Sequence, residues 1–340
     1  MKKTLVAVAA IFAATGAMAD ATISGFFDSA YTINSVTAAG TGLTTKRTNL
    51  APSGSGQNQI TFGASEDLGG GMKAFANLRI MPLPNSNALN QDASEIGVSG
   101  DFGTFQIGKD YSIDHGVIAQ VDASGYTGGS PGVVNIGNGG ASGNAVIYVL
   151  PTMVSGVGII VAKGLANGAS GDGDATAYKI SYTTGGLTVA YAGASVNNRA
   201  ATTAGWQSGF TTGGATAATE GTAANSKAGV TALGISYNLG MATVSFGSFT
   251  AKSGGDADQK ASANIMGVSI PFGATTIGLT SSSAKRTNAA GTAVKASGTR
   301  AKVSYALSKR TSAYGAIGSE SVEGTTATTK QTAFGLTHSF

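Results

Sequence analysis

A period-two alternation of apolar and polar side chains recurs along most of this 340-residue chain. In the segment 299–307, Val303 and Tyr305 fall on one face, and Arg300 and Lys302 fall on the other. This is the period of a β-strand with one apolar side. The same pattern occurs at 21–33, 59–65, 177–183 and 187–191. The pattern predicts an all-β fold.

Composition and run lengths narrow the choice of β architecture. Charged residues make up 11% of the chain, less than half of the roughly 25% found in soluble domains. Beyond the first nineteen residues, no apolar run reaches the ~18–20 residues of a membrane helix. Both features favour a transmembrane antiparallel β-barrel with an apolar outside and a polar inside. A secreted β-sandwich alternates in the same way and stays open on this criterion alone.

The first residues indicate export. Lys2 and Lys3 precede an apolar stretch at 4–16, and Ala17-Met18-Ala19 forms a small-x-small site. This order of parts predicts a signal peptide over residues 1–19. The barrel domain is then expected to span residues 20–340.

The connections between the alternating segments differ in length. Short glycine-bearing turns occur at 66–71, 100–103, 184–186, 238–240 and 272–273, and longer polar segments occur at 34–56, 112–143, 164–176, 196–227, 252–261, 285–297 and 320–330. Short periplasmic turns and long extracellular loops are typical of outer-membrane barrels. We expect about 16 strands, a number at which water fills the lumen.

Several segments resemble one family. The segments 65–74 (SEDLGGGMKA), 96–109, 144–151 and the terminal 334–340 are similar, in order, to Gram-negative trimeric porins of the Neisseria and Burkholderia type. The resemblance implies a homotrimer with a passive pore in each subunit and a third loop, 112–143, that folds inward. It also implies that the outer-membrane assembly machinery recognises the terminal strand through Phe340.

In that family, arginines on the barrel wall face acids on the third loop. Gln59, Lys109, and Ser142 or Gly143 stand here where arginines would be expected. Only one of the three positions is therefore basic. The selectivity of the pore must then depend on other charged residues.

Parity along the strands identifies those residues. A charge facing lipid at mid-depth costs ~2–4 kcal/mol, so charges are expected to face inward. Lys109 is in phase with outward residues, and a bulge at Gly108 would re-aim it. Asp28 and Glu95 are also expected to face inward. The expected pore-lining set is Lys73, Arg79, Lys109, Lys179, Arg300 and Lys302 on the wall, with Asp114 and Asp122 on the third loop. A weakly basic wall predicts a weak preference for anions.

Other classes of function have little support. With no cysteine and only two histidines, the chain offers neither a catalytic triad nor a Cys/His metal site, and we expect no enzyme activity and no cofactor. A net charge of +4 is too small to indicate nucleic-acid binding. We expect an outer-membrane pore, surrounded by lipid, for passive diffusion of small hydrophilic solutes and ions. The alternative is a non-conducting surface β-barrel that acts as an adhesin or ligand-binding protein.

Overall fold

A computed structural model describes most of the chain after residue 19. The described residues are 20–52, 58–82, 89–111, 113, 115–124, 141–165, 174–199, 226–253, 259–287, 291 and 293–340. The predicted signal peptide, residues 1–19, lies outside them. None of the helices in the described part is long and apolar enough to cross a membrane.

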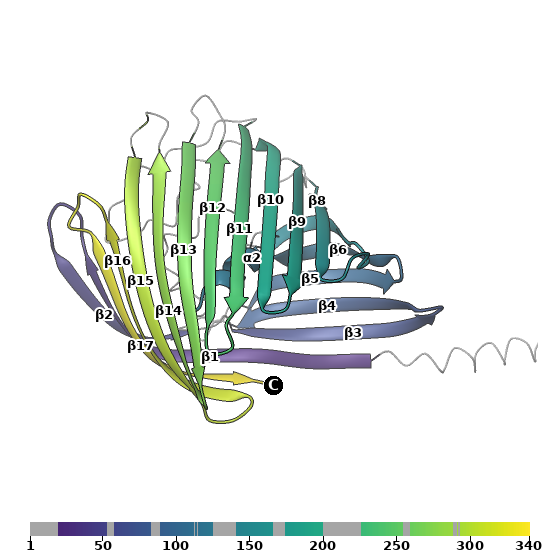
Figure 1. The fold of residues 1–340 in the computed structure, drawn as a ribbon, viewed down its shortest axis with the longest axis horizontal. Coiled ribbons are helices and arrows are strands. Elements are labelled where there is room, and N and C mark those ends of the chain that lie inside the picture. The colour runs from purple at the N-terminus through teal and green to yellow at the C-terminus, as the bar shows by residue number, and fades with distance from the viewer. Residues whose placement is uncertain are drawn as a thin grey trace, which may run out of the picture.

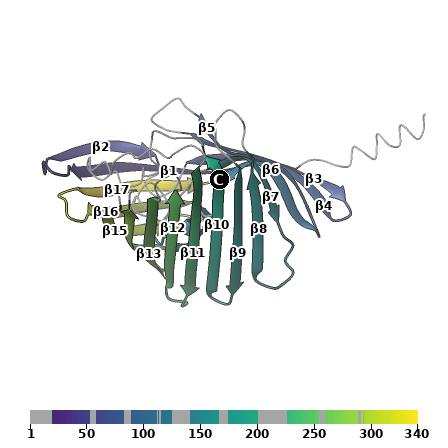
Figure 2. The same cartoon turned by 90° about the horizontal axis from the view of Figure 1, so that it is seen from above.

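The described chain forms one sheet of seventeen strands in which neighbouring strands are antiparallel (Figures 1 and 2). Pairing of the first strand with the last closes the sheet into a barrel. The strands are β1 (Asp20–Thr37), β2 (Thr44–Pro52), β3 (Gln59–Gly69), β4 (Met72–Pro82), β5 (Leu89–Gly100), β6 (Gly103–Tyr111), β7 (Ala141–Val149), β8 (Val157–Gly164), β9 (Ala175–Thr184), β10 (Leu187–Arg199), β11 (Ser226–Asn238), β12 (Thr243–Ser253), β13 (Gln259–Phe272), β14 (Thr275–Thr287), β15 (Ala293–Ala306), β16 (Thr311–Val322) and β17 (Thr328–Ser339).

The seventeenth strand arises because β1 has two partners on one side. Its second half pairs with β2 and its first half with β3, so β2 and β3 follow one another along the same edge. The barrel therefore has sixteen strand positions, as predicted. The prediction of a loop over 34–56 was wrong for 34–37 and 44–52. Those residues are mostly polar, with Val36 and Leu50 as the large apolar side chains among them, so hydrophobic alternation could not reveal them as strand.

The two faces of the sheet differ as the alternation predicted. Tyr178, Ile180 and Tyr182 of β9 are exposed on the outside, while Lys179 between them is partly buried. On β1 the exposed Tyr31 follows Asp28, which is only 1% exposed. Outward apolar residues form the lipid-facing band of an outer-membrane barrel.

The strands on one side of the barrel run further than the sequence suggested. β12–β13 are joined through 253–259, β14–β15 through 287–293 and β16–β17 through 322–328, each connection shorter than predicted. The added strand residues are mostly Ser, Thr, Lys and Ala, which carry no apolar period. These strands therefore continue past the apolar band on the side of the longer loops.

The terminal residue completes the ring. The backbone of Phe340 exchanges two hydrogen bonds with Gly25, of 3.0 and 3.1 Å. Its ring stacks on Phe27 with centroids 6.0 Å apart and lies directly over Gly25. A methyl group at Gly25 would lie 2.6 Å from ring atom Cε1. The missing side chain at Gly25 thus leaves the space that the Phe340 ring occupies.

We therefore expect Gly25→Ala to weaken closure of the barrel, because overpacking against the ring costs about 1–3 kcal/mol. The temperature at which the folded band converts to the unfolded band in heated SDS gels should fall. Gly315→Ala is the matched control, since its nearest neighbour would lie at an ordinary 3.6 Å. Equal conversion temperatures for Gly25→Ala and the unmodified protein would show that packing of Phe340 does not require glycine at this position.

Candidate functional site

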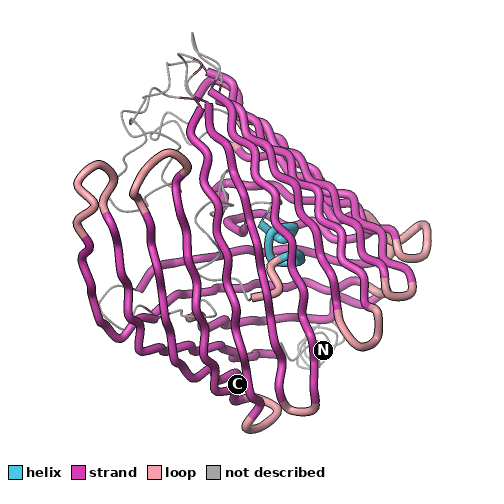
Figure 3. Tube along the Cα trace, turned by 60° about the vertical axis from the view of Figure 1, so that its left-hand side comes forward, coloured by secondary structure: helices cyan, strands magenta, loops and turns pink. Residues whose placement is uncertain are grey.

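The connection between β6 and β7 turns into the barrel. Its described part contains a short helix, α2 (His115–Val121), which contacts β10, β11, β12 and β13. Figure 3 shows α2 enclosed by the strands. Residues 115–124 therefore lie in the lumen, within the third loop expected at 112–143. Ser112, Asp114 and residues 125–140 of that loop lie outside the described residues.

Glycines on the inner wall make room for this segment. A methyl group at Gly234 of β11 would lie 2.8 Å from Val117, and one at Gly247 of β12 would lie 2.8 Å from Val121. Gly234 and Gly247 are direct cross-strand partners. Gly267 and Gly278 extend this glycine track to β13 and β14, where the segment 121–124 passes. Each glycine lets the loop approach the wall at backbone distance.

Polar contacts fasten the loop along the same track. Ser245 Oγ donates to the Val121 carbonyl at 2.7 Å. The Asp122 carboxylate accepts from Ser124 N at 3.0 Å, from Ser124 Oγ at 2.7 Å and from Thr280 Oγ1 at 3.0 Å. Asp122 is only 7% exposed. The structure therefore places Asp122 as a buried anchor between the loop and β14.

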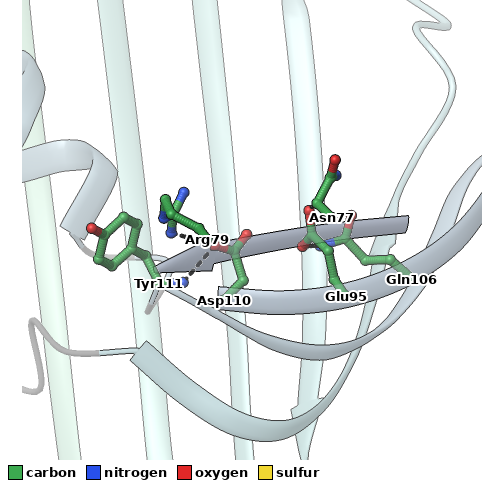
Figure 4. A network of polar contacts seen from close by, with 6 residues as sticks. All are labelled: Asn77, Arg79, Glu95, Gln106, Asp110 and Tyr111. Atoms are coloured by element: carbon green, nitrogen blue, oxygen red, sulfur yellow. Dashed lines mark hydrogen bonds and ion pairs between the residues drawn. The ribbon is translucent and has the colours of Figure 1, made fainter. Parts of the chain in front are cut away.

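One polar network lies on the wall where β6 leads into the loop (Figure 4). Arg79 Nη2 pairs with Asp110 Oδ1 at 3.3 Å, and its guanidinium lies 4.3 Å from the centroid of the Tyr111 ring. Tyr111 in turn stacks on His115, with centroids 4.2 Å apart and planes 2° apart. Arg79, which parity placed inward, therefore supports the entry to α2.

A second part of this network surrounds Glu95. Its two carboxylate oxygens accept from Asn77 Nδ2 at 3.0 Å and from Gln106 Nε2 at 2.9 Å. These three residues come from β5, β4 and β6, and Figure 4 shows them beside the Arg79–Asp110 pair. The inward direction predicted for Glu95 is confirmed.

The other charged part of the lumen lies on β1 and β14–β16. Tyr314 Oη donates to Asp28 at 2.8 Å, and Lys302 Nζ lies 5.3 Å from the centroid of the Tyr314 ring. Arg300 interacts electrostatically with Asp28 and Asp122. Arg286 and Arg300 are 3% and 4% exposed. Arg300 and Lys302 thus lie near Asp28, while Arg286 lies six residues along β14 from Thr280, the cross-strand partner of Arg300.

The remaining predicted residues are spread along the barrel. Lys179 Nζ lies 3.7 Å from the position a methyl group would take at Gly116 of α2, and so sits beside the loop. Lys73 is exposed and lies one residue after Met72, where β4 begins at the short turn from β3. A register shift occurs between Gly108 and Asp110, but its extra residue lies on β7, and the pairing of β6 with β5 runs unbroken through Lys109. The inward re-aiming of Lys109 therefore stays a prediction.

Two charged lumen residues were not predicted from the sequence. Asp110 has the same parity as Gln106, whose side chain faces inward, so parity alone could have revealed it. Arg286 was assigned to a loop because β14 was ended too early. Extending the alternation through Thr280, Ser282 and Ala284 places it on the inner face.

The lumen also holds a pocket of about 330 Å³ between the loop and β12–β15. Half of its lining residues bear a hydroxyl group, and its charged lining residues are Lys302 and Asp122. Among the described residues, no group of three His, Cys, Asp or Glu side chains is placed to hold a metal ion. The geometry is that of a polar passage narrowed by a loop.

Comparisons with known proteins agree with this geometry. The family model of Gram-negative porins matches residues 5–325. No curated protein sequence matches the chain in a direct comparison.

Solved structures share the fold. An anion-selective porin from Comamonas acidovorans superposes with a TM-score of 0.75 at 21% identity, covering 95% of this chain and 100% of that one. OmpT of Vibrio cholerae in its trimer form gives 0.73 at 12% identity, covering 95% and 99%. OmpF of Salmonella typhi in complex with daunomycin gives 0.68 at 15% identity, covering 94% and 97%. With the family match over nearly its whole length, the chain belongs to the Gram-negative porins and is a channel of the outer membrane.

Proposed function

We propose that this porin passes small hydrophilic solutes and ions with a weak preference for anions. The observation that carries the proposal is the inward segment 115–124, which narrows a lumen lined by charges of both signs. Among the described residues, we assign to the inner face the cations Arg79, Lys179, Arg286, Arg300 and Lys302 and the acids Asp28, Glu95, Asp110 and Asp122. The small excess of positive charge supports a preference that is weak.

We further propose that the mature protein begins near residue 20 and assembles as a homotrimer. The signal-like residues 1–19 and the resemblance to trimeric porins support these steps, and the OmpT relative was solved as a trimer. Docking of Phe340 on Gly25 supports the terminal strand as the last to close, in keeping with recognition of that strand by the assembly machinery. A channel needs no catalytic residue, and enzyme activity is not part of the proposal.

The decisive experiment is planar-bilayer recording of the detergent-extracted oligomer. Stepwise conductance is expected, with a reversal potential in a salt gradient whose sign reports anion preference. If folded, inserted protein shows no conductance, the channel proposal is wrong and a surface-binding barrel is favoured. Conductance with a cation-selective potential would retain the channel and reject the proposed preference.

Arg79 offers a test of the filter. Arg79→Glu replaces the cation of an ion pair by a third carboxylate beside Asp110 and Glu95, so selectivity should move clearly toward cations. The shift should shrink at high salt, because the Debye length falls from about 10 Å at 0.1 M to about 3 Å at 1 M. Arg310→Gln, on the exposed turn between β15 and β16, is the control and should leave the reversal potential unchanged. An unchanged potential in Arg79→Glu removes Arg79 from the filter.

Asp122 offers a test of the loop anchor. Asp122→Ala leaves Ser124 and Thr280 without their acceptor, a loss of about 1–3 kcal/mol, so the loop should loosen and open-channel noise should rise. Asp122→Asn keeps an acceptor oxygen and removes only the charge. We expect Asn to change selectivity with little added noise. Equal noise in Asp122→Ala and the unmodified channel would show that Asp122 does not hold the loop.

A further inference from the structure

The side chain of Tyr314 crosses three strands on the inner face of the barrel. Its cross-strand partner on β17 is Gly335, which is in turn the partner of Ala30 on β1. A methyl group at Gly335 would lie 2.5 Å from both Cζ and Oη of Tyr314. The ring therefore occupies the space above that glycine, and the side chain passes from β16 over β17 to β1. Tyr314 is only 5% exposed in this position.

The hydroxyl group of Tyr314 holds a carboxylate in the wall. Tyr314 Oη donates to Asp28 Oδ1 at 2.8 Å, and the backbone N–H of Asp28 donates to Asn58 Oδ1 at 2.5 Å. Asp28 is 1% exposed and Asn58 is 3% exposed. A phenol donates a hydrogen bond to a carboxylate oxygen without bringing a positive charge to it. Asp28 is thus fixed at the wall through both its backbone and its side chain.

The face of the same ring lies beside a lysine. Lys302 Nζ of β15 is 5.3 Å from the centroid of the Tyr314 ring, within the range of about 6 Å at which a cation is attracted to an aromatic face. Lys302 also interacts electrostatically with Asp28. One uncharged side chain therefore contacts two opposite charges, the ammonium through its face and the carboxylate through its hydroxyl.

The charges of this cluster differ in their access to the lumen. Lys302 is partly buried and lines the pocket of about 330 Å³ between the loop and β12–β15. Asp28 is almost fully buried, and so is Arg300, which precedes Lys302 by two residues on β15. Because the interaction of two charges falls with distance and with the dielectric constant between them, an ion in the pocket responds most strongly to Lys302. The orientation of the cluster therefore matters as much as its net charge.

From this arrangement we propose that Tyr314 is a positioning residue for the selectivity of the pore. It keeps the Asp28 carboxylate at the wall and supports the Lys302 ammonium on the side of the passage, so that the cluster presents its positive side to solutes. The inference rests on the proposed anion preference and assigns part of that preference to a side chain that carries no charge.

Tyr314→Phe tests the hydroxyl group while keeping the ring beside Lys302. Without the donor, one oxygen of Asp28 can turn toward Lys302, so the anion-to-cation permeability ratio should fall by roughly twofold, an effect limited by solvent screening. The measurement is the reversal potential of the detergent-extracted oligomer in a planar bilayer under a salt gradient. Tyr305→Phe is the control: it makes the same substitution at a residue 53% exposed on the outer face, and it should leave the potential unchanged.

The Asp28→Asn background separates positioning from a change in pore shape. With no carboxylate charge to position, adding Tyr314→Phe should have no further effect. Asp28→Asn alone and the double variant should therefore give the same reversal potential. A change in pore shape would instead shift the potential equally with and without Asp28→Asn.

Gly335→Ala provides an independent route to the same result. The added methyl group would displace the Tyr314 ring from its place above β17, so the potential should again move toward cations, and again only while Asp28 is present. Gly315→Ala is the matched control, because its methyl group would lie 3.6 Å from the nearest atom. Heat-modifiability in SDS gels shows that each variant is folded.

Two results would overturn the proposal. One is a reversal potential equal to that of the unmodified pore in both Tyr314→Phe and Gly335→Ala, which would leave Tyr314 a structural role only. The other is an equal shift with and without Asp28→Asn. If the unmodified pore is itself cation-selective, the proposed anion preference is wrong, yet Tyr314→Phe should still move the potential further toward cations. The two proposals can thus fail separately.

Discussion

The rest of this structure depends on pairing every backbone N–H and C=O group inside a solvent that offers no hydrogen bonds. In lipid, each unpaired group costs several kcal/mol, so a sheet must close on itself. Here closure is made between β1 and β17, along twelve residues of register from Phe26–Ser339 to Thr37–Thr328. The terminal Phe340 extends that seam by two further hydrogen bonds to Gly25. A glycine is needed there because the ring lies flat where a side chain would stand.

A closed barrel of this width creates a second problem, since its lumen is too wide for wall side chains to fill. The β6–β7 loop addresses it by packing on the wall rather than by standing free in water. The glycine track from Gly234 to Gly278 lowers the inner surface, and Val117 and Val121 become fully buried against it. The hydrogen bond from Thr280 to Asp122 then holds this part of the loop against β14. The width of the passage is thus set by packing and hydrogen bonds, and its charge is set separately by the wall.

The apolar alternation of the sequence predicted which strand side chains face inward, but it did not predict the polar strand segments or the contacts between distant strands. The outward faces of β1, β9 and β15, and the inward position of Asp28, Glu95, Arg79 and Arg300, came from strand parity alone. The strand at Thr44–Pro52 and the end of β14 with Arg286 were missed because most side chains there are polar and show no apolar alternation. The pairing of Arg79 with Asp110 and the glycine track depend on contacts between strands distant in sequence. No local pattern encodes those contacts.

Charged residues on the inner and outer faces of the barrel wall differ in how their charge is compensated. Inside, three of the cations lie near acids: Arg79 pairs with Asp110, and Arg300 and Lys302 interact electrostatically with Asp28 and Asp122. Outside, Lys285 and Lys295 are cross-strand partners, and within the described part of the chain Glu323 forms an ion pair with Lys295. A buried cation must find its counter-charge within the protein, because leaving it unpaired costs several kcal/mol. An exposed cation is under no such constraint, because water and dissolved ions screen its charge.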